Sequence, residues 1–318
     1  MPARPADHPA PRVRPFRRSD RDQLTDLLNR HAAAVLPGVS ASVNTVLGSL
    51  EQRPEEYVTD PWVADRATLV AEDRSRLVAA AHLLRYRDDA DVDPSYRGSG
   101  SVEWFLHVPA AAGPADHLMA ACLARLATWN TRPWHADGNL PVPGVYGVPG
   151  PWPHVRALYE RAGFRHTGGT ETLLLATVRE LPTGPTPHGL TVDRTLGDLG
   201  TRFTARRDGH TLGHLDVDTG LERAERRPRD GALADLADLD LADTDLSDDA
   251  PDEVFGALLA RAAEWLRWCG VDRVLAYVDG AEDADDTGGA AARVAERLRR
   301  YGFAEVTRTD RGWTRTRP

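Results

Sequence analysis

Two pairs of segments resemble each other in the same order along this chain, and this repetition limits the fold more than any other feature. Residues 123–129, LARLATW, match residues 259–265, LARAAEW. Further on, each half has a helix-like segment that ends in Gly-Phe, at 163–164 and at 302–303. A glycine in that place can take the left-handed conformation that ends a helix. Because both pairs occur in the same order, we interpret the chain as a duplicated domain.

A run rich in proline and glycine separates the two copies. Residues 181–189, LPTGPTPHG, contain three prolines and two glycines, which neither a helix nor a central strand accommodates. The chain has 318 residues, and about 150 residues per domain is the usual expectation. We therefore predict a disordered tail at 1–11, one unit at 12–180, a linker at 181–189 and a second unit at 190–318.

Helix-like and strand-like segments alternate in both halves. The first half predicts helices at 19–31, 115–129 and 154–162 and strands at 13–16, 68–72, 77–84, 101–108, 144–148 and 171–176. The second half predicts strands at 202–206, 211–216 and 273–278, with a poor strand near 239–241. The run 234–253, mostly Asp, Leu and Ala, is interpreted as a solvated, partly disordered surface segment. This alternation indicates an α+β or α/β sheet covered by helices.

Composition excludes several classes of protein. The formal net charge is −9, which argues against nucleic acid as a partner. No apolar run approaches the ~18 residues of a membrane span, and the first dozen residues lack an apolar signal region, so we expect no membrane partner. The two cysteines, Cys122 and Cys269, cannot build a disulfide framework, and a cytoplasmic location is expected. The sequence leaves a homodimer open.

The segment Leu158-Tyr-Glu-Arg-Ala-Gly-Phe164 and the strand–loop–helix unit from Val102 to Trp129 resemble motifs of the GNAT (Gcn5-related N-acetyltransferase) family. The resemblance covers most of the chain and is present twice. It implies two GNAT-like domains, each with a mixed, mostly antiparallel central sheet flanked by helices. It also implies an enzyme that binds acetyl-CoA and transfers the acetyl group to an amine of a small molecule or a protein.

The resemblance places a diphosphate-binding loop before the helix that begins near residue 115. A helix N-terminus offers unpaired N–H groups and partial positive charge to such an anion. The family pattern Q/R-x-x-G-x-G/A corresponds to 110–115, with Gly113 and Ala115 at the small positions, alanine at the polar one, and Pro114 without an N–H. The predicted cofactor-binding residues here are Ala112, Gly113, Pro114, Ala115 and Asp116.

The strand before this loop is expected to bind the pantetheine arm through its backbone. Members of the family splay this strand from the next, so the resemblance assigns the arm to Leu106, His107 and Val108. The family often has an asparagine early in the last helix, where this chain has Trp152.

The second copy carries acids at the corresponding helix start. Asp248, Asp249, Asp252 and Glu253 lie where a polyanion would sit, and like charges ~4 Å apart repel by about 4 kcal/mol at a protein surface. Leu298 stands in register with Tyr159 and cannot donate a proton. We therefore expect a degenerate second unit that is structural or shapes the acceptor site.

Acyl transfer to an amine needs a base for the ammonium proton and an acid for the leaving thiolate. Tyr159 matches the family position whose phenol often protonates the thiolate; packing of its ring is the alternative. Glu103 and His107 alternate onto one strand face, and Glu103 is the preferred base, against the alternative of a solvated strand residue. The histidines show no zinc-like spacing, so no metal is expected. A non-catalytic tandem GNAT-like protein that binds a ligand or partner is the rival hypothesis.

Overall fold

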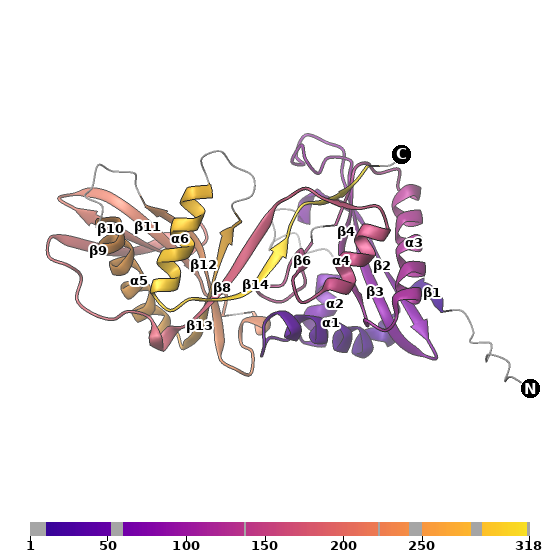
Figure 1. Ribbon diagram of the computed structural model, residues 1–318, viewed down its shortest axis with the longest axis horizontal. Helices are drawn as coiled ribbons and strands as arrows, with labels where there is room; N and C mark the ends of the chain where they lie inside the picture. Colours follow the sequence, from indigo (N-terminus) through magenta and orange to yellow (C-terminus); the bar gives the residue numbers. More distant parts are fainter. Residues whose placement is uncertain are drawn as a thin grey trace, which may run out of the picture.

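The strands of this protein form two sheets that lie along the long axis of the molecule (Figure 1). The computed structural model describes residues 11–51, 60–136, 138–221, 223–241, 250–280 and 288–316. We call the parts built around the two sheets the first lobe and the second lobe.

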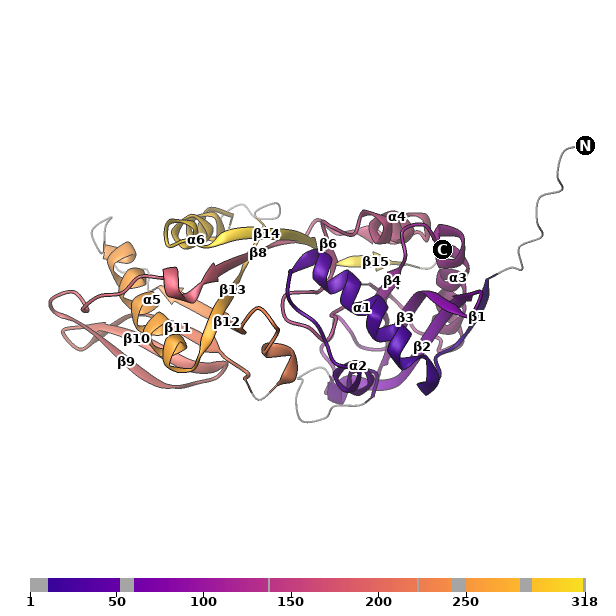
Figure 2. The ribbon, with the colours of Figure 1, turned by 90° about the horizontal axis from the view of Figure 1, so that it is seen from below.

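The first lobe contains a seven-stranded sheet of order β1-β2-β3-β4-β5-β15-β7. Its strands are β1 (Arg12–Pro15), β2 (Val63–Asp73), β3 (Arg76–Tyr86), β4 (Gly100–His107), β5 (Trp134–His135), β15 (Trp313–Arg315) and β7 (Arg165–His166). Its helices are α1 (Arg21–Val35), α2 (Val43–Ser49), α3 (Ala112–Thr128) and α4 (Pro153–Arg161). In Figure 2, α3 and α4 lie above this sheet and α2 lies below it.

The second lobe contains an eight-stranded sheet of order β6-β14-β8-β13-β12-β11-β10-β9. Its strands are β6 (Val148–Pro149), β14 (Ala304–Asp310), β8 (Thr170–Thr177), β13 (Val271–Asp279), β12 (Ala232–Leu241), β11 (His210–Asp218), β10 (Gly200–Arg207) and β9 (Leu190–Gly197). Its helices are α5 (Ala250–Trp268) and α6 (Gly288–Arg300). The pairs β4–β5 and β12–β13 are parallel and the other ladders given for the described residues are antiparallel, which confirms the predicted mixed, mostly antiparallel α+β architecture.

Each sheet contains a strand from the other half of the chain. Strand β8 precedes the linker, yet it lies between β13 and β14, with Leu175 opposite both Leu275 and Ala304. Strand β15, near the C-terminus, lies between β5 and β7, with Thr314 opposite His135 and Arg165. The predicted units 12–180 and 190–318 follow the repeat along the chain. The two sheets do not follow these boundaries, because β8 of the first unit belongs to the second sheet and β15 of the second unit belongs to the first.

The interior strands of the first lobe are buried because helices cover both faces of the sheet. Strand β3 carries the small and apolar run LVAAAHLL, and Ala79, Ala80 and Leu83 are fully buried although neighbours in a strand point to opposite faces. The hairpin turn between β2 and β3 holds Arg74 and Ser75 at positive φ.

Two sequence-based expectations were wrong. The predicted strand 144–148 is a loop that ends in the short β6, because Gly144 and Gly147 have φ of +73° and +56°, which a strand does not allow. The run 234–253 begins as the interior strand β12, whose Asp235 and Asp238 pair with Arg226 and His214 and so become compatible with burial. Residues 242–249 lie outside the described residues.

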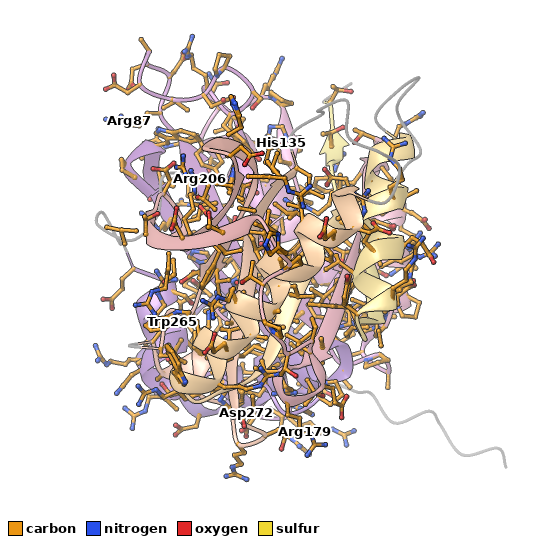
Figure 3. The ribbon with its side chains drawn as sticks, turned by 90° about the vertical axis from the view of Figure 1, so that its left-hand side faces the viewer. Arg87, His135, Arg179, Arg206, Trp265 and Asp272 are labelled. Atoms are coloured by element: carbon orange, nitrogen blue, oxygen red, sulfur yellow. The ribbon has the colours of Figure 1, made fainter. Side chains whose placement is uncertain are left out.

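The tryptophan of the repeated LAR-x-A-x-W motif makes a cation–π contact in both copies, with arginines from different places. The Arg125 guanidinium of the motif itself lies 4.9 Å from the ring centroid of Trp129, just after α3. In the second lobe, the guanidinium of Arg194 from β9 lies 4.1 Å from the ring of Trp265, which is in the last turns of α5 and is labelled in Figure 3.

The cores of the two lobes meet at the loop between β5 and α4. Leu173 and Leu275 from the second sheet are buried in one cluster with α1 and this loop. A side chain at Gly144 would place its Cβ 3.1 Å from Leu173 and 3.2 Å from Leu275, so the backbone of the loop lies directly against the second sheet. In the described part of the chain, no helix is long and apolar enough to cross a membrane.

The strand exchange predicts that neither half folds alone. Residues 11–180 lack β15 and residues 188–316 lack β8, so each would leave a gap inside its sheet. We expect no cooperative thermal transition by circular dichroism for either half, and recovery when the two are co-expressed. As a control, a protease site placed in 182–187 of the full chain should yield, after cleavage, two fragments that co-elute in gel filtration; fragments that separate would contradict this.

Candidate active site between the two lobes

Strands β4 and β5 separate soon after they meet, which opens the first sheet. Among the residues that the structure describes, they pair only at Gly100–Trp134 and Ser101–His135. The chain after β5 then passes over β4 at one point, where a Cβ on Gly138 would lie 1.7 Å from the Glu103 carbonyl oxygen. Beyond this point, the edge of β4 at Phe105 and His107 faces a gap, which we call the β4–β5 gap.

The hydrogen-bond alternation of β4 decides which backbone groups reach this gap. Val108 N donates to Val78 O of the preceding hairpin at 2.9 Å, so alternation directs the backbone of Leu106 to β3 as well. Val108 O accepts from Ala111 N at 2.8 Å. Of the three residues predicted to bind the pantetheine arm, only His107 therefore directs its backbone into the gap, together with Phe105, which the sequence analysis missed.

Three histidines and a tryptophan surround the end of the β4–β5 gap. His31 Nδ1 lies 2.9 Å from Leu27 O, and its Nε2 lies 3.2 Å from His107 O and 3.3 Å from His154 Nε2. Trp152 Nε1 donates to His31 O at 3.1 Å. These contacts link α1 to the start of α4 across the gap.

The tautomer of His31 decides whether the ring donates a hydrogen bond to the His107 carbonyl. Burial lowers the pKa of His31, so the ring is neutral and has a single N–H. When Nδ1–H donates to Leu27 O, the shorter of the two carbonyl contacts, Nε2 accepts from His154 Nε2–H. The His107 carbonyl then keeps its lone pairs for a ligand.

Helix α3 has an open N-terminus. A Cβ on Gly113 would meet nothing within 4 Å. Ala115 N donates to Ala111 O at 3.0 Å and Pro114 has no N–H, which leaves the first-turn N–H groups of Ala112 and Gly113 for an anion. Ala115 is fully buried.

Asp116 is paired with a residue of α4. Arg161 Nη2 lies 2.8 Å from its Oδ1, so the acid at this helix start is balanced by a guanidinium. Of the five loop residues in the prediction, Ala112 and Gly113 thus present donors, while Ala115 and Asp116 make contacts within the chain.

The corresponding helix start in the second lobe is occupied by ion pairs. Asp252 accepts from Arg297 at 2.5 Å and from Arg300 at 2.7 Å, and Glu253 pairs with Arg207 at 2.8 Å. Asp248 and Asp249 lie outside the described residues. The second unit is still only predicted not to bind CoA, and these ion pairs are consistent with that prediction.

Tyr159 and Glu103 line one small crevice, although they come from α4 and β4. Its volume is about 10 Å³, and Gly147, Trp152 and Val155 also line it. Tyr159 is buried, with ring centroids 5.5 Å from Phe164 and 6.0 Å from Trp313 of the exchanged strand β15. Glu103 Oε1 accepts from Asn139 N at 3.3 Å. The structure therefore brings the two predicted catalytic side chains together.

A larger pocket of about 310 Å³ lies between the lobes and adjoins this crevice. Five residues line both cavities: Glu103, Trp104, Leu140, Val145 and Tyr146. His82 also lines the pocket, with its Nδ1 2.9 Å from Thr68 Oγ1. Burial, with a smaller effect of Arg66, lowers the pKa of His82 to about 3, so this histidine is neutral and a poor base.

The second lobe supplies the opposite wall of this pocket, which the sequence analysis did not find. Arg223 and Arg226 come from a short 3₁₀ segment (Ala224–Arg226) and the residue before it, Asp235 comes from β12 and Tyr277 from β13. Arg226 Nη2 lies 2.5 Å from Asp235 Oδ2, and Tyr277 OH donates to Asp235 Oδ1 at 3.2 Å. The mixed-charge run at 223–230 was the only signal, and it resembles an ordinary surface loop.

Solved structures share this arrangement of two lobes. No protein-family model and no curated protein matches the sequence. A tandem GNAT protein from the clavulanic acid biosynthesis pathway is 17% identical, with TM-score 0.58 over 96% of this chain and 98% of its own. A GCN5-related N-acetyltransferase from Sphaerobacter thermophilus is 13% identical, with TM-score 0.59 over 98% and 97%.

A third similar structure is the GCN5-related glucosamine N-acetyltransferase region of a fungal multi-domain GH3 β-N-acetylglucosaminidase. It is 14% identical, with TM-score 0.61. The match covers 98% of this chain but 39% of that longer protein. This chain has the tandem GNAT fold. The fold predicted from the repeat and from the Gly-Phe motifs is thereby confirmed. Within the described ranges, no three or more His, Cys, Asp or Glu side chains are arranged so that they could hold a metal ion.

The buried histidines of this tandem GNAT fold predict a pH-dependent stability. Burial lowers the folded-state pKa of His31, His107, His154 and His82, to about 4 for His154 and about 3 for His82, whereas an unfolded histidine titrates near ~6.5. Between these values the unfolded state binds more protons, so the stability present above pH ~6.5 is lost as the pH falls.

We expect the free energy of unfolding to decrease from pH 7 to pH 5, by up to about 1.4 kcal/mol per pH unit for the fully buried His82. Urea denaturation at several pH values measures this slope. His82→Gln should reduce the slope by up to about 1.4 kcal/mol per pH unit, the effect of one proton. A flat profile between pH 7 and 5 would show that folding does not lower the pKa of these histidines.

Proposed function

We propose that this protein is an acetyl-CoA-dependent N-acetyltransferase in which the first lobe binds the thioester and the pocket between the lobes binds the amine. The observation that carries the proposal is the shared lining of the two cavities. It places an amine in the 310 Å³ pocket next to the crevice that Glu103 and Tyr159 line. The acceptor is a small molecule, since a pocket of this volume matches small-molecule sites.

The described residues fit the two ends of acetyl-CoA. The N–H groups of Ala112 and Gly113 at the open start of α3 would bind the diphosphate, and the backbone groups of Phe105 and His107 that face the β4–β5 gap would pair with the pantetheine arm. Bound acetyl-CoA supplies the activated acetyl thioester. Leu106 and Val108 contribute through the strand that they hold against β3.

Glu103 and Tyr159 would move the two protons of the reaction. Glu103 accepts the proton of the ammonium group, directly or through water, so that the nitrogen lone pair becomes the nucleophile. The amine then forms the new C–N bond, Tyr159 donates its phenolic proton to the leaving sulfur as the C–S bond breaks, and the second proton that the amine nitrogen loses on becoming an amide restores the Tyr159 phenol, directly or through water. The buried contact with Trp313 holds the Tyr159 ring in position.

Ligand binding without turnover is a second candidate function. It is favoured by the contacts of His31, Trp152 and His154, which join α1 to α4 across the β4–β5 gap. An enzyme must open or rearrange these contacts around the arm, whereas a binding protein can retain them. Binding of acetyl-CoA or of an amine with no release of free CoA would favour this second function.

The open start of α3 predicts a charge-sensitive CoA site. Wild type should gain thermal stability with millimolar acetyl-CoA, because binding to the folded state stabilises it by mass action. Gly113→Glu should abolish this gain, since the carboxylate would face the diphosphate. Gly113→Ala is the matched control and should keep the gain, because its Cβ meets nothing within 4 Å. An unchanged gain in Gly113→Glu would place the cofactor elsewhere.

Tyr159 provides the test of turnover. Tyr159→Phe should lower kcat for CoA release by ~100-fold or more, the usual contribution of a general acid, with little change in KM for the thioester. Thiol release with a set of small amines measures it. If kcat stays within twofold of wild type, Tyr159 is a packing residue against Phe164 and Trp313.

A further inference from the structure

The wall of the pocket that faces away from the crevice belongs to the second lobe. Arg223, Arg226, Asp235 and Tyr277 line the 310 Å³ pocket but not the crevice that holds Tyr159. An acceptor whose amine points to Glu103 therefore presents its other end to these four residues. Their chemistry determines which group that end carries.

Arg226 is a buried guanidinium with unused donors. Its side chain is 9% exposed, and one terminal nitrogen pairs with Asp235 at 2.5 Å. The other, Nη1, is buried and has no hydrogen-bond partner among the described residues. A buried donor without a partner destabilises the folded protein, so such a group in a binding wall indicates that a ligand satisfies it.

Both carboxylate oxygens of Asp235 already accept hydrogen bonds from residues of this wall. Its Oδ2 accepts from Arg226 and its Oδ1 from Tyr277. Asp218, the other acid near Arg226, lies 3.8 Å away. Arg223 adds a second guanidinium to the same wall. A planar guanidinium with free N–H groups suits a carboxylate, which accepts two parallel hydrogen bonds.

The opposite side of the pocket has the reverse character. Glu103 stands where the pocket meets the crevice, and Trp104, Tyr86 and Leu84 provide apolar surface between the two ends. Glu51 and Arg66 of the first lobe also line the pocket and contribute one charge of each sign. Asp235 balances one of the two guanidinium groups of the second-lobe wall, so this wall keeps one guanidinium in excess, while the Glu103 carboxylate lies toward the crevice. This polarity matches a zwitterion with an ammonium group at one end and a carboxylate at the other.

We propose that the acceptor is a small amine that also carries a carboxylate, as in an amino acid, and that Arg226 binds this carboxylate with help from Arg223. The proposal rests on the proposed acetyl transfer for the direction of the amine. It gives the degenerate second unit a specific task, which is to select the acceptor.

The test compares amines that differ only in the carboxylate: phenylalanine with phenethylamine, leucine with isoamylamine, and 4-aminobutyrate with propylamine. CoA release should give a kcat/KM at least tenfold higher for the carboxylate-bearing member of at least one pair. Arg226→Gln should reduce this ratio tenfold or more, and Arg226→Lys should restore part of it. Because a ratio within one protein cancels the fraction that is misfolded, it separates recognition from folding.

Two further variants keep the test decisive. If Arg226→Gln does not fold, Arg223→Gln replaces it and should lower the same ratio. Arg179→Gln removes a guanidinium that does not line the pocket, is 82% exposed and is labelled in Figure 3, and it should leave the ratio unchanged. Equal or better use of the amines without a carboxylate, or a ratio unchanged in both Arg226 and Arg223 variants, overturns the proposal.

A failure of acetyl transfer is distinguished by binding. If no amine releases CoA, the same pairs are tested by thermal shift with the full chain and no acetyl-CoA. Stabilisation by the amino acids alone, lost in Arg226→Gln, supports the carboxylate site while the transferase function fails. No difference between the members of each pair overturns the carboxylate site as well.

Discussion

The exchange of strands β8 and β15 is the constraint on which the rest of this structure depends. Each sheet is completed by hydrogen bonds to a strand from the other half, so the two lobes are joined through their interiors and not only through a linker. The exchange fixes the loop at 140–147 against Leu173 and Leu275. It also brings Trp313 to the ring of Tyr159, so the end of the chain forms part of the first lobe's site.

The same fold element has opposite electrostatics in the two copies. Helix α3 begins with an open glycine and two unused N–H groups, while α5 begins with Asp252 held between Arg297 and Arg300. Backbone dipoles attract an anion at both helix starts, but the side chains decide whether the place is available. In the proposed function, the open helix start of the first lobe binds a diphosphate, and the second lobe provides a wall for a different ligand.

Local patterns predicted most of the secondary structure. Apolar periodicity located α3 and α5, and short apolar runs located β3 and β4, because the side chains that face the core are apolar. The short helix α2 and the exchanged strand β15 were missed, since segments of this length carry little pattern. Strand β12 was misinterpreted because its aspartates become compatible with burial only through Arg226 and His214, which lie elsewhere in the sequence.

The sequence by itself determined that the chain is duplicated and that a helix with a small N-terminal loop follows a buried strand. That Tyr159 and Glu103 transfer protons stays a prediction. Only the tertiary structure decided which strand completes which sheet and which Leu106–Val108 backbone groups face the gap. It alone placed Arg226 and Asp235 opposite Glu103. The physical reason is that periodicity reports burial within an element, whereas strand order, ladder alternation and ion pairs join residues that are far apart in the chain.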